Sequence, residues 1–433
     1  MRFVSISIVM MLPLIASAQD TLFTPQHVAK LRFVTEAVIS PDGTQVAYIL
    51  GVPRDLAKEK DGGAWTELHV VDTKGNSTPF ITGQVNVGSI SWTPDGKNIA
   101  YLSKREKDKT RCLYAIGGRG GESRKLLEHA TDIQSYSFSG DGKQVAFLAT
   151  EPPSPERKKR IEQGFNQEVY EEDAPFVRVY VGQAFQPDDA DPKRQAGKPD
   201  LLKLPGSASE LHFNPKEDKL AVALAPTPSI DEHLMFRKVH IVEITSRERE
   251  GAVVGKITKV ENPGKLGQMA WSLDGKRLAI ISAADKHDPM QGRLWIHTLG
   301  EKGWTHLNGN TENGHVESIA WGLNGTICIQ ASFGVETAVA CVSTEKELPV
   351  GFTRSEVILS NLTVAPQKNA MAFLGHTAGH PLEVFYQGQD EGTPPAHRQQ
   401  PLAEDDAVRQ AGGDQVQGPG RPRTRRPLDP SAE

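Results

Sequence analysis

The stretch Val38-Ile39-Ser40-Pro41-Asp42-Gly43, followed closely by Val46-Ala47-Tyr48-Ile49, decides the fold of this chain. Alternating apolar residues predict a strand, Pro-Asp-Gly predicts a tight turn, and the second apolar run predicts a returning strand, so the phrase indicates a β-hairpin. The phrase recurs six more times, in clear or degenerate form. The further copies occupy residues 90–102, 136–148, 211–222, 269–280, 319–325 and 362–374.

A second pair of strands around a polar turn is expected after each hairpin, as in residues 111–127 and 293–307. Each repeat then supplies four antiparallel strands, which make one propeller blade, and the turns recur about every 54 residues, within the range of blade periods. The sequence therefore predicts an all-β, seven-bladed β-propeller of four-stranded antiparallel blades over residues 19–393. Such a closed ring should have no long exposed sheet edge. A stack of unrelated sandwich domains is the alternative.

Composition excludes several classes of protein. The 433 residues carry 49 Lys and Arg against 54 Asp and Glu, for a net charge of −5. Because the two charges nearly balance, the composition argues against a dedicated nucleic-acid binder, which needs a basic face or tail. After the first residues no apolar run approaches the length of about 18 that a membrane helix needs. The 40 glycines and 29 prolines indicate many turns.

The first 18 residues are typical of a signal peptide. Arg2 supplies a positive charge, residues 3–15 are largely apolar, and Ala16-Ser17-Ala18 places small residues where a signal peptidase cleaves, before Gln19. A retained membrane anchor is the alternative. We therefore expect an exported protein, periplasmic or extracellular, that is not bound to a membrane after cleavage.

Three cysteines are present, at positions 112, 328 and 341. Cys328 and Cys341 flank Gly334 and Val335 symmetrically, as they would across a hairpin. We expect two buried thiols there, and a cross-strand disulfide is the alternative. No C-x-x-C motif occurs, so the cysteines predict neither a structural zinc site nor a redox site.

One repeat contains a charged insertion, residues 152–173, in the longest interval between turns. The insertion is Pro-rich at first, then basic in residues 157–160, then acidic at Glu171, Glu172 and Asp173. This charge pattern predicts a short solvated helix or arm that projects from the ring. Insertions on a rigid scaffold are where function usually departs from the scaffold.

The opening residues 22–31 together with Val38-Ile39-Ser40-Pro41-Asp42-Gly43 resemble the start of secreted prolyl oligopeptidase family serine peptidases, both dipeptidyl and acylaminoacyl types. The resemblance covers residues 19–380 and includes a short helix that Thr24 caps and Pro25 begins. It implies a propeller that lies over an α/β-hydrolase domain and restricts the active site to short peptides. That hydrolase domain carries a Ser-Asp-His triad, with the serine in a G-x-S-x-G elbow.

This sequence contains no G-x-S-x-G motif. We therefore expect no catalytic residues, no metal and no cofactor in the chain, and a non-catalytic, substrate-gating propeller that is inactive alone. Short peptides would be its ligands if the hydrolase domain were present.

Residues 169–173, Val-Tyr-Glu-Glu-Asp, resemble the double-acid stretch of dipeptidyl peptidases. The resemblance implies that Glu171, Glu172 and Asp173 pair with the free amino terminus of a substrate, because an ammonium offers three donors and a charge. The sequence departs from that pattern at Asp173, where a further glutamate would be expected. The alternative is a solvated acidic segment that balances the charge of the basic residues 157–160.

The tail, residues 394–433, differs from the rest of the chain. It is rich in proline and arginine, contains no lysine, and shows no strand pattern, which predicts disorder. Residues 396–430, back-translated with suitable synonymous codons and read one nucleotide later, can give a peptide that resembles the linker into a hydrolase domain. We therefore expect a frameshift near Pro394 that truncated a longer peptidase before its hydrolase domain.

Two other classes of function stay open at this point. One is a stand-alone periplasmic propeller similar to the Tol-system protein, which would bind partner proteins at its ring face. The other is a hydrolase that acts in its own central channel, although the sequence shows no convergent set of His, Asp or metal ligands for it.

Overall fold

The computed structural model describes residues 25–55, 57–170, 172–184, 198–247, 251–287, 291–307, 314–344, 353–355, 357–388 and 400–401. Residues 32–404 form one compact unit, and the segments 1–31 and 405–433 form another. In the second unit helix α1 (Pro25–Val28) begins at the expected proline. The predicted signal peptide (1–18) lies outside the described residues, as does the predicted tail (394–433) apart from residues 400–401.

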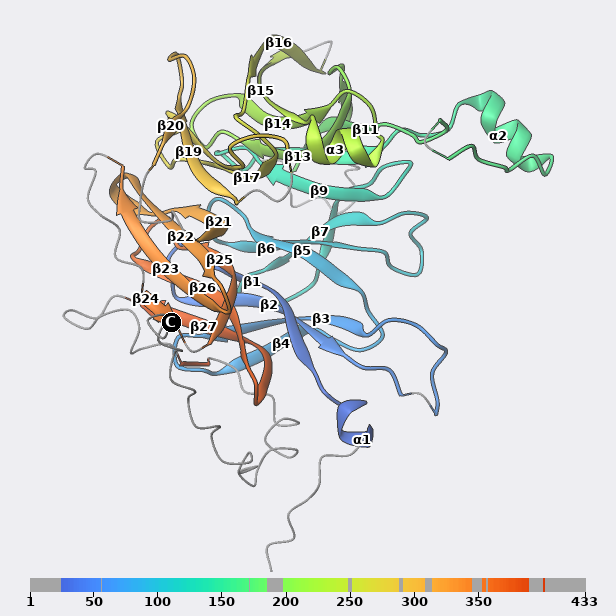
Figure 1. Ribbon diagram of the computed structural model, residues 1–433. Helices are drawn as coiled ribbons and strands as arrows, with labels where there is room; N and C mark the ends of the chain where they lie inside the picture. Colours follow the sequence, from blue (N-terminus) through green and yellow to red (C-terminus); the bar gives the residue numbers. More distant parts are fainter. Residues whose placement is uncertain are drawn as a thin grey trace, which may run out of the picture. The chain divides into compact units, whose positions relative to one another are not determined.

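The unit of residues 32–404 contains seven four-stranded antiparallel sheets, each built from four consecutive strands (Figure 1). This confirms the prediction of a seven-bladed propeller, and each of the seven phrases forms the first hairpin of one blade. First strands of neighbouring blades contact each other, as β1 does with β5 and β25, so they lie innermost. The first strands are β1 (Phe33–Ile39), β5 (Val87–Trp92), β9 (Ile133–Phe138), β13 (Ser207–Phe213), β17 (Leu266–Trp271), β21 (His315–Trp321) and β25 (Ile358–Val364).

The remaining strands follow outward in sequence order. The second strands are β2 (Gln45–Val52), β6 (Asn98–Ser103), β10 (Gln144–Thr150), β14 (Lys219–Ala225), β18 (Arg277–Ser282), β22 (Thr326–Phe333) and β26 (Ala370–Thr377). The third strands are β3 (Trp65–Asp72), β7 (Cys112–Gly117), β11 (Val177–Gln183), β15 (Lys238–Arg247), β19 (Arg293–Thr298), β23 (Glu336–Ser343) and β27 (His380–Gly388). The outer strands are β4 (Ser77–Ile81), β8 (Arg124–Leu127), β12 (Asp200–Leu202), β16 (Gly251–Val260), β20 (Thr305–His306), β24 (Thr353–Ser355) and β28 (Gln400–Pro401).

Closure of the ring does not remove the outer edge of each blade. Six outer strands are two to five residues long, but β16 has 10 residues. The expectation that no long edge is exposed was therefore wrong for blade 4. The ring pairs blades side by side through their inner strands, whereas the edge of the outermost strand faces away from the neighbouring blades.

The repeated turn is held by its own side chains. In the first copy Ser40 Oγ donates to Asp42 Oδ1 at 2.6 Å and accepts from the amide of Gln45 at 3.0 Å. Gly43 has a φ of +68°, a left-handed conformation that favours glycine. The same Ser/Thr-to-Asp hydrogen bond recurs in the turns of blades 2, 3 and 5. The phrase therefore specifies a complete local structure.

Strand direction alternates within each blade, which gives the ring two distinct faces. We call the turn face the one that carries the turns between first and second strands, with Asp42 and its equivalents. We call the arm face the opposite one, which carries the connections between second and third strands. These connections are residues 53–64, 104–111, 151–176, 226–237, 283–292, 334–335 and 378–379.

The core lies between the blades. Apolar clusters each join residues of adjacent blades, including blades 7 and 1. Trp92, Trp271 and Trp321 occupy equivalent positions at the ends of first strands and are buried. Each indole Nε1 donates at about 3 Å to a backbone carbonyl oxygen on the first strand of the preceding blade.

A second set of hydrogen bonds crosses the same junctions. Every first hairpin contains a register shift that interrupts its ladder. In several blades a side chain of the preceding blade accepts from an amide near this shift: Glu36 from Ile90 at 2.8 Å, and Glu210 from Met269 at 2.9 Å. Asn361 accepts from Ala37 at 3.1 Å and so joins the last blade to the first.

Cys328 and Cys341 form a disulfide, so the expectation of two buried thiols was wrong. The two residues lie directly opposite each other in the register of β22 and β23, which brings their side chains together on one face of blade 6. Cys112 is a free, buried cysteine.

Denatured without reductant, the protein should react with iodoacetamide at one cysteine, Cys112, and after reduction at all three. Reduction should also destabilise the protein by about 2–3 kcal/mol, because it frees a short loop in the unfolded chain. Mass spectrometry counts the adducts and urea unfolding measures the stability. Three adducts without reductant would contradict the disulfide.

Candidate functional site

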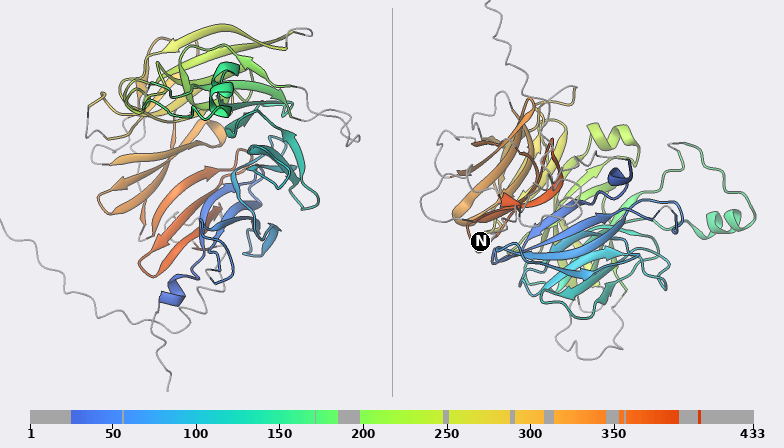
Figure 2. Two further views of the ribbon diagram at one scale, coloured as in Figure 1. Left: turned by 90° about the vertical axis from the view of Figure 1, so that its right-hand side faces the viewer. Right: turned by 90° about the horizontal axis from the view of Figure 1, so that it is seen from below.

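The insertion in blade 3 forms an arm, residues 151–176, between β10 and β11. Helix α2 (Pro155–Glu162) projects from the ring in Figure 1 and Figure 2 and has no buried residue, which confirms the predicted solvated helix. Ser154 caps it by accepting from the amide of Arg157 at 3.1 Å, and Pro155 occupies its first turn. The sequence thus contains its own start signal for a helix that no core supports.

The arm returns to the ring through a fixed base. The amide of Glu151 donates to the carbonyl oxygen of Phe176 at 2.8 Å, and Arg178 forms an ion pair with Glu151 at 3.1 Å. The guanidinium of Arg178 also lies 4.4 Å from the centre of the Phe176 ring. These contacts clamp the two ends of the arm where they leave β10 and enter β11.

The acidic residues lie in a turn near that base. Asp173 accepts from the amide of Val169 at 2.9 Å through Oδ2, and its own amide donates to the carbonyl oxygen of Val169 at 3.1 Å. Glu172 and Asp173 are exposed. Glu171 lies outside the described residues. One carboxylate oxygen of Asp173 is therefore committed to the turn, while no described residue pairs with the carboxylate of Glu172.

The basic residues 157–160 and the acidic residues Glu172 and Asp173 lie in the described part of the arm. Arg157 donates to the carbonyl oxygen of Gln167 at 2.7 Å and so ties the helix to the returning chain. No ion pair joins residues 157–160 to Glu172 or Asp173 within that part.

Large apolar side chains are exposed mainly on the arm face. They lie on the arm, on helix α3 (Ile230–Met235) in the blade 4 connection, and at the ends of β1 and β22. Helix α3 was not anticipated from the sequence, although Ser229, which caps it, is a recognisable start signal. The exposed apolar residues on this face are Phe33, Ile161, Phe165, Val169, Tyr170, Ile230, Leu234, Phe236 and Val335.

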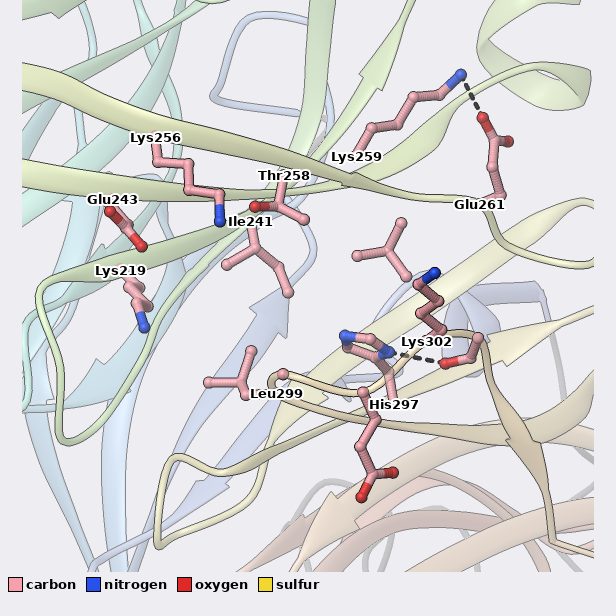
Figure 3. A pocket seen from close by; sticks show the side chains of 14 residues that line it. Lys219, Ile241, Glu243, Lys256, Thr258, Lys259, Glu261, His297, Leu299 and Lys302 are labelled. Carbon is pink, nitrogen blue, oxygen red and sulfur yellow. Dashed lines mark hydrogen bonds and ion pairs between the residues drawn. The ribbon is translucent and has the colours of Figure 1, made fainter.

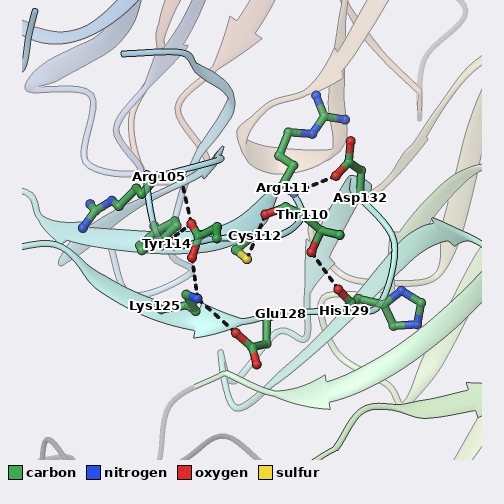
Figure 4. A network of polar contacts seen from close by, with 10 residues as sticks. Arg105, Thr110, Arg111, Cys112, Tyr114, Lys125, Glu128, His129 and Asp132 are labelled. Atoms are coloured by element: carbon green, nitrogen blue, oxygen red, sulfur yellow. Dashed lines mark hydrogen bonds and ion pairs between the residues drawn. The ribbon is translucent and has the colours of Figure 1, made fainter. Parts of the chain in front are cut away.

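A polar network fixes the arm-face connection of blade 2 (Figure 4). Asp108 accepts from Tyr114 Oη and from Lys125 Nζ, both at 2.6 Å, and from the amide of Arg105 at 2.9 Å. Burial opposes ionisation of Asp108, but these hydrogen bonds outweigh it and hold its pKa below the ordinary value. With its carboxylate satisfied, Asp108 supports a loop and offers nothing to a ligand.

The inner wall contains one carboxyl group with a strongly shifted pKa. Burial raises the pKa of Glu36 from 4.5 to about 7, although amide donors at Ser89 and Ile90 oppose the shift. Ser89 has a φ of +52°, uncommon for a residue other than glycine, and its carbonyl oxygen accepts from Tyr136 Oη at 2.7 Å. Glu36 and Tyr136 thus hold the same strained bend of β5.

A pocket of about 520 Å³ opens between blades 4 and 5 (Figure 3). Its apolar floor is formed by Ile241, Val260 and Leu299, and lysines and glutamates surround it. Within the described residues no cluster of three or more His, Cys, Asp or Glu could hold a metal ion. Over the same residues no helix is long and apolar enough to cross a membrane.

No protein-family model matches the chain. YuxL, an uncharacterized peptidase of Bacillus subtilis, is 32% identical over 125 residues, which are 29% of this chain and 18% of the relative. Dipeptidyl-peptidase 5 of Porphyromonas gingivalis is 25% identical over 324 residues, which are 69% of this chain and 44% of the relative. The chain therefore spans less than half the length of either relative.

Solved structures share the fold. The propeller domain of the Trilobed protease from Pyrococcus furiosus has a TM-score of 0.57 at 16% identity and matches 87% of this chain and 99% of that domain. Acylaminoacyl peptidase from Pyrococcus horikoshii has a TM-score of 0.59 at 12% identity, over 87% of this chain and 53% of that protein.

The fold is that of the propeller domain of prolyl oligopeptidase-family peptidases. The resemblance expected from the sequence is thereby confirmed. The Trilobed protease propeller is described as having an open velcro topology. In this chain every blade is built from consecutive strands, so no described strand from one end of the chain completes a blade at the other.

Replacing Glu36 with Gln should change how stability depends on pH. Because the folded state raises the pKa of Glu36 from 4.5 to about 7, it binds the proton more tightly than the unfolded state. Stability should therefore be greatest below the lower value and decline as the pH rises toward the higher, by at most about 3 kcal/mol. Urea unfolding at several pH values should show this decline in the parent protein and a weaker one in Glu36→Gln. Equal slopes would contradict the shifted pKa.

Proposed function

We propose that this propeller selects short peptides for a serine peptidase of the prolyl oligopeptidase family and gates their access to a hydrolase domain that is absent from these 433 residues. The sequence contains no G-x-S-x-G elbow, which supports a chain that does not hydrolyse peptides alone. The relatives with matching sequence are peptidases. The observation that carries the proposal is the exposed acidic turn at the base of the arm.

The chemistry of that turn suits the amino terminus of a peptide. The exposed carboxylates of Glu172 and Asp173 lie on a base that the Glu151–Arg178 ion pair clamps. An ammonium group donates three hydrogen bonds and carries a full charge, so paired carboxylates can bind it in one orientation. Glu171, which precedes them in the sequence, completes the proposed set. Binding of the free amino terminus at this turn would fix how many residues separate it from the peptide bond that is cleaved.

The arm face is the side that we propose faces the hydrolase domain. Exposed apolar side chains of the arm and of α3 gather on this face, whereas the turn face carries the hydrogen-bonded Asp turns. Contiguous apolar surface on a soluble protein usually marks a contact with another protein or a ligand. This placement would set the acidic turn beside the substrate.

We also propose that the protein is exported. Residues 1–18 have the pattern of a signal peptide, and the Cys328–Cys341 disulfide is the kind of bond that persists in oxidising compartments. The frameshift near Pro394 belongs to the same proposal, because it accounts for the change in composition over residues 394–433.

Transfer of the arm tests the substrate-binding role. The arm, residues 151–176, would replace the corresponding segment of a dipeptidyl-peptidase 5, followed by the changes Glu171→Gln, Glu172→Gln and Asp173→Asn. We expect KM for free-amine dipeptide substrates to rise about tenfold or more, because charge-assisted hydrogen bonds each contribute roughly 1.5–3 kcal/mol. KM for N-acylated substrates should not change.

Glu156→Gln is the matched control, since Glu156 lies in the exposed first turn of α2 on the same arm. It should leave KM for both substrate types unchanged. An equal response of the control and the acidic-turn variants, or a KM that ignores the free amine, would refute the role of the acidic turn.

The purified chain itself tests the non-catalytic assignment. Fluorogenic aminoacyl and dipeptidyl substrates should show no turnover above that of a heat-denatured sample. Reading the nucleotide sequence beyond the codon for Pro394 tests the frameshift. A shifted frame should encode a linker and, further on, a G-x-S-x-G elbow; absence of that elbow in every frame would reject the proposal.

A further inference from the structure

The outer strand of blade 4 differs from the other six outer strands. β16 has 10 residues, and β15 is its one strand partner in the described chain, where it ends the order β13-β14-β15-β16. Residues 255–259 are all exposed. A strand of this length at a sheet edge presents a row of backbone donors and acceptors that another extended chain can pair with.

Contacts at both ends hold this edge in place. Near its start the amide of Ala252 donates to Asp200 Oδ2 of blade 3 at 2.9 Å. Just beyond its end Trp304 Nε1 of blade 5 donates to the carbonyl oxygen of Glu261 at 2.8 Å. The stretch between these contacts is therefore supported on both sides and open along its outer edge.

One face of the edge opens into the pocket of Figure 3. The pairing of β15 with β16 has a register shift between Val254 and Ile257, and beyond it side chains alternate along β16. Lys256, Thr258 and Val260 then share a face, and all three line the pocket, as Lys259 also does. Leu299 and the loop at Lys302 of blade 5 form the opposite wall. A strand added beside β16 would place every second side chain over this same face, at the mouth of the pocket.

The charges along the edge favour an acidic partner. From Ala252 to Lys259, β16 contains Lys256 and Lys259 and no acidic residue, so an added strand meets lysines as its charged cross-strand neighbours. Lys259 also forms an ion pair with Glu261, directly beyond the strand, and a partner carboxylate would share it. Opposite charges across paired strands attract, and like charges destabilise the pair. The same lysines disfavour neutral or basic strands, which gives the edge selectivity.

We propose that the β16 edge binds an extended acidic segment of a partner protein by strand addition, with alternate side chains of that segment entering the pocket between blades 4 and 5. The backbone of the partner supplies affinity through hydrogen bonds with the backbone of β16, and its carboxylates pair with the ammonium groups of Lys256 and Lys259. This site is on the outer rim of the ring and is independent of the acidic turn of the arm.

The probe is a fluorescein-labelled peptide with capped ends and the repeat Val-Glu-Val-Val-Glu-Val, whose glutamates are three residues apart and can therefore pair with Lys256 and Lys259 on opposite faces of the sheet. It is titrated with the full chain and read by fluorescence anisotropy. We expect saturable binding that weakens about tenfold in the variant Lys256→Glu/Lys259→Glu, because two cross-strand charge pairs are lost and reversed. Lys97→Glu/Lys143→Glu is the matched control: both lysines are exposed on the turn face, at 79% and 70%, and should not affect binding.

Two further measurements separate strand addition from loose attraction between charges. The same peptide with methyl groups on alternate backbone nitrogens, in either register, should lose binding in the register that blocks the ladder. Hydrogen exchange should slow in residues 253–259 when the unmodified peptide is bound. Absence of binding, equal loss in the control variant, unchanged binding of both methylated peptides, or protection elsewhere would each overturn the proposal.

Discussion

The ring depends on hydrogen bonds that cross from one blade to the next. Each blade is completed by its own four strands, and among the described strands no ladder joins one blade to another. Isolated backbone hydrogen bonds and side chains therefore support the junctions. The register shifts in the first hairpins leave backbone amides outside the ladder, and these amides donate to side chains such as those of Glu36 and Asn361. Because a buried amide without a partner costs free energy, a polar residue of the preceding blade accepts from the amide near the shift in several blades. The indole of Trp92 and its equivalents add a second link.

This constraint explains why a carboxyl group lies in the inner wall. Glu36 serves as an acceptor for blade 2, and burial against the strained bend at Ser89 is the consequence of that position. Glu210 holds the same place in blade 4, where it accepts from Met269 and also contacts His212 at 2.8 Å. Glu36 and Glu210 are thus part of the architecture of the ring. In the acidic turn of the arm, by contrast, the one described side-chain hydrogen bond is accepted by an oxygen of Asp173.

Much of the fold follows from the sequence, because the hairpin phrase encodes its own turn, its own alternation and its period. The arm was also predictable, since proline, charge and the lack of apolar residues are local signals. Long-range contacts were not. The symmetric placement of Cys328 and Cys341 around a turn allows both two thiols and a disulfide, and the register of β22 and β23 decides between them. The sequence likewise gives no signal for the role of Glu36, because that role depends on an amide 54 residues away. The length of β16 was also not predicted, because local propensity does not fix where that strand begins and ends.

The helix of the arm buries no residue, and the chain on both sides of it is fixed by the clamp at Glu151 and Arg178. Substitutions between the two ends of the clamp therefore leave the packing of the ring untouched. Such a segment can change its length, charge and shape over generations without a loss of stability that selection would remove. In this architecture the choice of ligand can evolve at a rate of its own, separate from the slow divergence of the blades.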